Sequence, residues 1–429
     1  MTLAAIAAVA VLVRVIYIVA IYPSSNLSGD ALEFHFLARL LADGYGYVQP
    51  GPLTELVVGN AGNELVVRPD GPRVPTAEKP PLYPLVLSLG SVIDETSYTL
   101  QRLISAVLGA GSVILAGLIA RRIASPRVGL IAAALAAVYP PLVLIDGSLH
   151  SESLYVLLVA AALLAALRTI DHPTWQRAAA LGALIGLAAL TRGEGVLLLA
   201  LLAAPVIVWS ARPAFWRPLL ATLAAAALVL VPWVARNWIT FDRPAAISTN
   251  EGGLLFGANC DAAYFGGEIG SWPCFPPPDP TGTTNEAAIS ARLRGEALDY
   301  AREHAERVPA VVAARVLRVW DLWAPPAGTA SFEAQNSRHA GLQTAAAWSL
   351  YALLPFAVAG AWLLRRARPE LGVLLVPVLM VTLVAALTYG TVRFRAAAEV
   401  SLLVLGALAL ERAAILMRNR AESRRTQAQ

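Results

Sequence analysis

The sequence predicts an all-α protein integral to a membrane, with about ten transmembrane helices and two large extracytoplasmic loops. Hydrophobic residues make up 57% of the 429 residues, charged residues make up 14%, and the mean hydropathy is +0.61. Soluble domains carry about 25% charged residues, so we expect most of this chain to lie in lipid as a single membrane domain over residues 1–429. The net charge is only +4, and the basic residues fall at helix ends, which argues against nucleic acid as a partner.

Apolar blocks near the length of a membrane-spanning helix, about 20 residues, recur along the whole chain. Short loops rich in arginine separate alternate blocks, and such loops face the cytoplasm. Placing all of these loops on one side requires about ten spans and puts both termini in the cytoplasm. The first block carries Arg14 and lacks the basic start of a signal peptide. The blocks are 3–22, 99–120, 127–145, 152–168, 178–191, 195–210, 218–235, 344–364, 371–389 and 397–417.

Three apolar blocks are shorter than a full span. Block 81–93 opens with prolines, and counting it as a span would reverse every later loop, so we expect a helix along or partly inside the outer interface. Blocks 178–191 and 195–210 predict a tight hairpin. Its tip, residues 191–195, would lie within the outer leaflet.

The two long loops predict ordered structure outside the cytoplasm. In the first, residues 23–98, apolar residues at helical spacing predict an amphipathic surface helix over 29–42, and alternating residues over 53–74 predict a β-hairpin. In the second, residues 236–343, we expect a helix over about 285–323. Both cysteines, Cys260 and Cys274, fall in this loop, where a disulfide is plausible if the loop is extracytoplasmic; two free thiols are the alternative.

Ionisable residues gather at the outer ends of the predicted spans. Such residues are costly at membrane depth and tend to be functional. A carboxylate near water can deprotonate an acceptor hydroxyl, cations can neutralise a phosphate leaving group, and the apolar helices can hold a lipid tail. This combination suits transfer of a sugar from a polyprenyl-phosphate carrier. The clusters are Asp30, Glu33 and His35; Glu78 and Lys79; Asp146, His150 and Glu152; Arg192 and Glu194; Arg236; and Arg393, Arg395 and Glu399.

Several segments resemble, in order, the bacterial family 39 glycosyltransferases of the GT-C superfamily, which are protein O-mannosyltransferase-like and aminoarabinose-transferase-like. The stretch Pro75–Pro84, with Glu-Lys-Pro-Pro-Leu-Tyr at its centre, is the most specific. The Asp-Glu pair of the yeast-type enzymes is absent, because Ala31 follows Asp30. The other matching segments are Asp30, 44–48, 151–152, 190–192, 232–237, 393–395 and Glu399.

The resemblance implies an inverting hexosyltransferase of the cell envelope with its site on the extracytoplasmic side of the bacterial cytoplasmic membrane. Asp30 would be the catalytic acid/base and Glu78 would position substrate. Glu152 is favoured over Asp146 as the second acid. Lys79, Arg192, Arg393 and Arg395 would contact the carrier phosphate.

The donor would be a polyprenyl-phosphate-linked hexose, mannose being the simplest choice. The acceptor hydroxyl of a protein, lipid or glycan stays open. Assistance by a divalent cation also stays open, and no metal ligands are assigned. The rival functions are a transporter or flippase of lipid-linked sugars and a membrane scaffold. For single residues the rivals are local: Asp30 as a helix cap, Lys79 as an interface anchor, and His35 as a packed residue.

Overall fold

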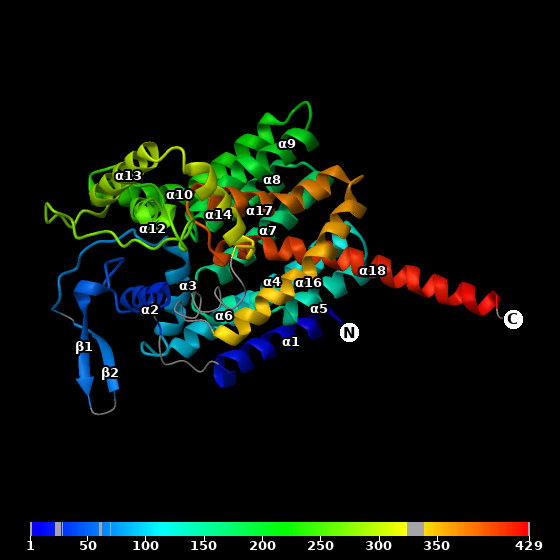
Figure 1. The fold of residues 1–429 in the computed structure, drawn as a ribbon, viewed down its shortest axis with the longest axis horizontal. Helices are drawn as coiled ribbons and strands as arrows, with labels where there is room; N and C mark the ends of the chain where they lie inside the picture. Colours follow the sequence, from blue (N-terminus) through cyan, green and yellow to red (C-terminus); the bar gives the residue numbers. More distant parts are fainter. Residues whose placement is uncertain are drawn as a thin grey trace.

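The computed structural model describes residues 2–21, 27, 29–59, 62–68, 70–323 and 339–427. A bundle of long helices occupies most of it, and a smaller outer-loop region with the β-hairpin covers one end (Figure 1). Both chain termini lie toward the opposite end of the bundle (Figure 1). The end of the first predicted span at Tyr22 and the part of the second loop over 324–338 lie outside the described residues.

The bundle is formed by helices from all parts of the chain. Their order alternates between the two ends of the bundle, as expected for a protein that crosses a membrane many times. The helices are α1 (Leu3–Ile16) with its π-helical extension (Tyr17–Ile21), α4 (Tyr98–Ile123), α5 (Pro126–Val138), α6 (Pro140–Gly147), α7 (Glu152–Asp171), α8 (Trp175–Ala189), a π-helix (Leu199–Ala203) leading into α9 (Ala204–Ser210), α10 (Trp216–Phe241), α16 (Ala340–Leu364), α17 (Arg368–Leu387) and α18 (Ala396–Gln427).

Within the described ranges, eight helical segments are long and apolar enough to cross a membrane, and the bent pair α5 and α6 makes a ninth. The bend of 52° falls between Val138 and Pro140, where proline disfavours a helical residue before it. The remaining expected span, 178–191, is α8, which has only 15 residues. Its end still reaches the start of α7, because Arg192 Nη1 lies 3.0 Å from Glu152 Oε1. The segment that ends α8 therefore lies beside the first residue of α7.

Small residues let neighbouring helices approach closely. A Cβ added at Gly182 in α8 would lie 2.1 Å from the backbone oxygen of Thr222 in α10, and one at Gly360 in α16 would lie 1.9 Å from that of Leu405 in α18. Thr222 also donates its hydroxyl to the Ala178 carbonyl at 2.9 Å. Small residues and interhelical hydrogen bonds are the usual means of packing helices in lipid, where hydrophobic burial between helices gives little.

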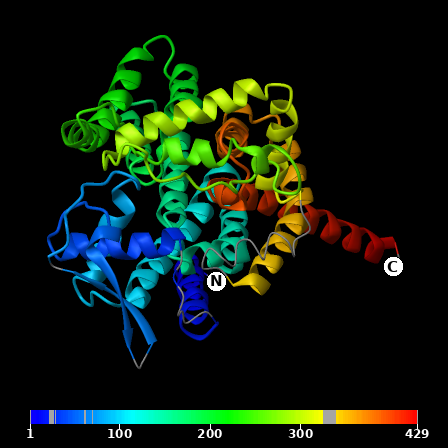
Figure 2. The same cartoon turned by 60° about the vertical axis from the view of Figure 1, so that its left-hand side comes forward.

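The first outer loop contains the predicted helix and hairpin. Helix α2 (Gly29–Ala42) packs on α3 (Leu82–Ser91), the short helix expected at the interface, and α3 packs on α4. Strands β1 (Thr54–Gly59) and β2 (Gly62–Val67) pair antiparallel, with Thr54 opposite Val67. Figure 2 brings this end forward, with the blue hairpin below and the yellow-green helices of the second loop above.

The second outer loop contains α11 (Glu251–Gly257), α12 (Asp261–Tyr264), α13 (Glu286–Glu303) and α14 (Val308–Val319). The expected single helix over 285–323 was wrong: it breaks between Glu303 and Val308, and Pro309, which lacks a backbone donor, opens the second piece. Cys260 and Cys274, predicted as a plausible pair, form a disulfide.

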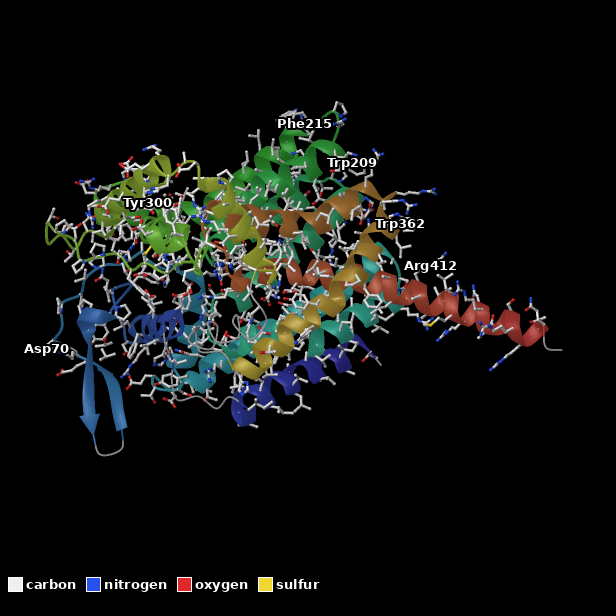
Figure 3. All side chains as sticks on the ribbon, viewed as in Figure 1. Asp70, Trp209, Phe215, Tyr300, Trp362 and Arg412 are labelled. Carbon is white, nitrogen blue, oxygen red and sulfur yellow. A yellow bond between two sulfur atoms is a disulfide. The ribbon has the colours of Figure 1, made fainter. Side chains whose placement is uncertain are left out.

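Exposed aromatic residues occur in the second outer loop, at Phe265 and Phe275, and also at the end of the bundle remote from the outer loops. Trp209, Phe215 and Trp362 lie there, whereas Asp70 and Tyr300 lie at the outer-loop end (Figure 3). Tryptophan is enriched at membrane–water interfaces. The distribution therefore fits a bundle whose two ends face two different aqueous phases.

Candidate active site

An alternating row of acids and cations lies where the outer loops meet the bundle; we call it the charge chain. Lys79 Nζ contacts Glu78 at 3.3 Å and Glu33 at 3.1 Å. It also contacts Asp30 Oδ1 at 3.0 Å, and the other Asp30 oxygen lies 2.9 Å from Arg393 Nη1. The row then continues deeper into the bundle.

The deep half of the charge chain is centred on Glu152. Its Oε1 accepts from Arg393 Nε at 2.9 Å and lies 3.0 Å from Arg192 Nη1. Arg192 Nε donates to Glu194 Oε1 at 2.6 Å. Arg393 thus bridges Asp30 and Glu152 through two different nitrogens, which the planar guanidinium holds at a fixed spacing.

Exposure along the charge chain is highest at Glu78 and Asp30 and lowest at Glu152. The side chains of Glu78 and Asp30 are 45% and 34% exposed, Arg393 is 11% exposed, and Glu152 is 1% exposed. Beyond Glu152, Arg192 and Glu194 are 15% and 21% exposed. The outer end therefore meets water, and the protein encloses Glu152. A site of this kind can admit a hydrophilic acceptor from one side and hold a charged group at depth.

Helix ends place both acids. Asp30 is the second residue of α2 and Glu152 is the first residue of α7. The N-terminus of a helix carries a partial positive charge that favours a carboxylate. Arg393 lies in a 3-10 helix over Val392–Arg395, which connects α17 to α18. Asp30, Glu152 and Arg393 therefore all belong to helical segments, which fix the positions of their backbones.

The Lys79 segment is fixed from the side of the second loop. Arg236 donates to the Thr76 carbonyl at 2.7 Å and to the Tyr47 carbonyl at 3.0 Å. Tyr47 in turn donates its hydroxyl to the Lys79 carbonyl at 2.8 Å, and Glu286 accepts from the Ala77 N–H at 2.8 Å. These contacts explain why segments 44–48 and 232–237 accompany the Glu-Lys-Pro-Pro motif: they hold its backbone.

Burial and neighbouring charge set the proton affinities at the outer end. Burial tends to raise the pKa of Asp30, but Lys79 and Arg393 outweigh burial and hold that pKa well below its usual range. Burial raises the pKa of Glu33 to about 7, and Glu78 and Asp30 add to this against the attraction of Lys79. Burial opposes the charged form of Lys79, yet its acidic neighbours keep the lysine pKa well above normal.

Six of the seven predicted site residues meet in the charge chain: Asp30, Glu78, Lys79, Glu152, Arg192 and Arg393. Arg395 does not meet the others through any contact between described side chains. It is buried, donates to Glu399 at 2.7 Å, and belongs to a separate cluster with Tyr139, which donates to the other Glu399 oxygen at 3.1 Å. The two arginines, separated by Phe394 in a 3-10 helix, point in different directions, and this could not be read from the sequence alone.

Asp146 also lies apart from the charge chain. Its carboxylate is buried against Arg14 of the first span at 2.6 Å, so Arg14 faces protein rather than lipid. Of the two acids that competed as the second site acid, Glu152 is the one that contacts Arg393 and Arg192. His35 is buried with its Nδ1 2.9 Å from Gln101 Oε1, and burial lowers its pKa to about 4, which fits the packed role expected for it.

Glu33 and Glu194 were not among the predicted site residues. Glu33 follows Asp30 by three residues and so lies on the same face of α2, a spacing that could have identified it. Glu194 lies two residues from Arg192 in the hairpin tip.

The described side chains do not form a group of three or more acids, histidines or cysteines arranged to hold a metal ion. Three carboxylates do converge, but the Lys79 ammonium already lies among them. The residues present therefore do not fit a resident divalent cation.

Comparison with known proteins agrees with this architecture. Residues 78–235 match the family model described as dolichyl-phosphate-mannose-protein mannosyltransferase, which supports the resemblance to family 39. The oligosaccharyltransferase AglB from Archaeoglobus fulgidus, in complex with an inhibitory peptide and a dolichol-phosphate, superposes with a TM-score of 0.53 over 98% of this chain at 17% identity. The apo form of the enzyme gives 0.57. The chain has the GT-C fold.

This GT-C chain spans about half of the AglB structures, 51% and 52% of their length. ArnT from Cupriavidus metallidurans bound to undecaprenyl phosphate aligns over 96% of this chain and 78% of its own, at 16% identity with a TM-score of 0.45. No curated protein matches the chain significantly. The GT-C bundle is a multi-pass membrane fold, in keeping with the apolar helices described above.

Proposed function

We propose that this chain is a membrane glycosyltransferase that moves a sugar, a hexose such as mannose, from a polyprenyl-phosphate carrier to an acceptor hydroxyl. The observation that carries the proposal is the position of Asp30. It is one-third exposed to water and lies between Lys79 and Arg393 at 3.0 and 2.9 Å. A base that faces water beside cations suited to a phosphate is what this reaction requires.

The donor phosphate would bind at Lys79 and Arg393. In the donor-free arrangement each of these cations is matched by carboxylates, so a phosphate must compete for them. As it attracts Lys79 and Arg393, it weakens their hold on Asp30. The pKa of Asp30, which the two cations keep low, then rises, and Asp30 becomes a better base only when the donor is present.

The reaction step balances as a single displacement. The acceptor hydroxyl gives its proton to Asp30, and its oxygen forms a bond to the anomeric carbon. The bond from that carbon to the phosphate oxygen breaks, and the electron pair leaves with the polyprenyl phosphate. Attack from the face opposite the phosphate inverts the anomeric carbon. Lys79 and Arg393 stabilise the charge that grows on the departing phosphate.

The remaining acids and arginines position this centre. Glu152 forms an ion pair with Arg393 on its buried side. Arg192 contacts Glu152 in turn, and Glu194 pairs with Arg192. Glu78 lies at the mouth, 45% exposed, where it would orient the acceptor or the sugar. Arg395 is better assigned to the stability of the bundle, because Glu399 and Tyr139 enclose it. The dolichol-phosphate in the AglB complex supports a donor of this class.

We also propose that the site faces the extracytoplasmic side of a bacterial cytoplasmic membrane. The arginine-rich short loops and the arginine-rich end of α18 lie at the opposite end of the bundle from the charge chain. Positive loops favour the cytoplasm. The disulfide in the second outer loop supports the same orientation, since disulfides persist outside the reducing cytoplasm.

Asp30→Asn tests the function directly. Asparagine keeps the shape of the side chain but cannot accept the proton, so the transfer rate from a purified polyprenyl-phosphate sugar should fall about 10²- to 10⁴-fold. Asp70→Asn, at an aspartate that is 82% exposed in the same loop, is the matched control and should leave the rate unchanged. The melting temperature in detergent verifies that both variants fold.

Two outcomes would contradict the proposal. Retained turnover by a folded Asp30→Asn variant would remove the base from its role. Movement of the intact lipid-linked sugar across vesicles, without cleavage of the sugar–phosphate bond, would favour a flippase.

A further inference from the structure

A groove lies at the end of the bundle remote from the charge chain, between α4, α7 and α8. Its volume is about 450 Å³, within the range of about 300–1,000 Å³ usual for ligand sites. Alanines line the groove on both α7 and α8. Ala161 and Ala165 share one face of α7, and Ala180 faces them from α8. Leucines at 115, 164 and 184 complete an apolar lining.

Two arginines form the polar end of this groove. Arg168 lies one turn beyond Ala165 on the same face of α7, and Arg177 lies on α8. Arg177 donates to the Arg168 carbonyl at 2.6 Å. Within the described part of the chain, neither guanidinium has an acid partner. The nearby Asp171 is bound by Arg122 through both of its oxygens, one through Nε at 2.7 Å, and Arg177 adds a weaker Coulombic attraction to the same carboxylate.

The arginines lie at the level of a membrane surface. Arg168 follows Glu152 by 16 residues along α7, which corresponds to roughly 24 Å of helix. The hydrocarbon core is about 30 Å thick, so the groove opens near the leaflet opposite the charge chain. Trp175, 61% exposed at the start of α8, has the position of an interfacial anchor. An apolar groove that ends in two arginines without a direct ion pair to a described acid is, at this depth, complementary to a lipid with a negative headgroup.

We propose that this groove binds an anionic glycerophospholipid of the leaflet opposite the charge chain. One acyl chain lies along the alanine-lined surface, and the phosphate accepts hydrogen bonds from Arg168 and Arg177. The inference is independent of the glycosyltransferase proposal, because it uses different residues at the other end of the bundle.

Native mass spectrometry of the delipidated full-length protein tests the proposal, with phosphatidylglycerol as the probe. Phosphatidylcholine with the same acyl chains, which has no net charge, is the comparison. The wild type should prefer phosphatidylglycerol. Arg168→Ala/Arg177→Ala should lower that affinity roughly 30-fold, the effect of about two arginines near an anionic headgroup. The control Arg127→Ala/Arg366→Ala removes two exposed arginines that do not line the groove and should retain the preference.

Ala165→Leu fills the groove without changing charge and provides a second arm. It should weaken both lipids while leaving the melting temperature close to that of the wild type. Equal binding of the two lipids by the wild type, or equal losses in the groove and control variants, would overturn the proposal. Displacement of phosphatidylglycerol from the groove by polyprenyl phosphate at lower concentration would also overturn it, since that would assign the groove to the carrier lipid.

Discussion

Asp30 and Glu33 share one face of α2 and one partner, the Lys79 ammonium, yet they differ in proton affinity. Two cations contact Asp30, at 3.0 and 2.9 Å, whereas Glu33 has only a share of Lys79 at 3.1 Å. Coulombic attraction therefore outweighs burial at Asp30 and fails to do so at Glu33. Their spacing of three residues is enough to place both acids on one face of the helix. It could not predict which one the Arg393 guanidinium reaches from the far end of the chain.

Glu33 should make the stability of the protein depend on pH. Burial raises its pKa from 4.5 to about 7 in the folded state, so the stability it contributes is fully present below pH 4.5 and is lost as the pH rises through 7. Glu33→Gln imitates the neutral form and removes this loss. The free energy of unfolding of the variant relative to the wild type should rise from pH 5 to pH 8, by an amount on the order of 2 kcal/mol. The melting temperatures of both proteins across this pH range report the change.

Glu303→Gln, at an exposed acid in the last turn of α13, serves as the matched control for Glu33→Gln. A difference between variant and wild type that stays constant from pH 5 to pH 8 would refute the assignment.

Arg393 and Arg395 should respond in opposite ways to substitution. Arg393→Lys keeps the charge but offers one nitrogen in place of two, so the contacts to Asp30 and Glu152 cannot both keep their geometry. We therefore expect roughly a 10²-fold loss of transfer rate with little change in melting temperature. Arg395→Ala removes the cation that pairs with Glu399, which is 1% exposed, and leaves that carboxylate only the hydroxyl of Tyr139. The change should cost about 3–5 kcal/mol of stability. Both quantities are measured on each variant. A strong loss of rate in a fully stable Arg395→Ala protein would return Arg395 to the phosphate site.

At the scale of elements, helix contacts depend on positions where a side chain has no room. α16 and α18 pack along each other, and Gly360 is where α16 meets the backbone of α18. The length of the apolar blocks predicted most of the spans, because each is a run of residues that must avoid water. It could not predict the break between α13 and α14 or the bend between α5 and α6, since both depend on how a proline is accommodated by its neighbours.

Gly360→Ala should weaken the contact of α16 with α18. The new Cβ would lie 1.9 Å from the Leu405 carbonyl oxygen, so the helices must separate, at a cost of about 1–3 kcal/mol. Gly372→Ala in α17 meets nothing within 4 Å and should be neutral or slightly stabilising. Thermal unfolding in detergent compares the two. Equal melting temperatures would show that α16 moves aside without cost.

At the scale of the whole molecule, the charge chain joins five segments that are far apart in the sequence. Lys79 and Arg393, for example, meet on Asp30 although 314 positions separate them (393 − 79). The arginine pattern predicted that these segments would lie at one end of the bundle. It gave no information on which acid would contact which cation, because that depends on the packing of α2, α7 and the 3-10 helix before α18.

The two termini should lie on the side opposite the hairpin. Single cysteines at Thr2, Asp70 and Arg425 report this, because both native cysteines are paired. In intact cells a membrane-impermeant maleimide should label Asp70→Cys alone, and the two terminal cysteines should react only after permeabilisation. The reverse pattern would invert the proposed orientation. Labelling of all three positions in intact cells would contradict the crossing pattern itself.

Helix α18 is longer than a membrane needs. Its 32 residues extend roughly 48 Å, well beyond a hydrocarbon core of about 30 Å, and its end projects from the bundle (Figure 1). A compact reporter domain joined to it through an uninterrupted helix would inherit its direction. Each residue added at the junction would turn that domain by about 100°, because a helix has 3.6 residues per turn. Particle orientation in electron microscopy could be set in this way, by junction length alone.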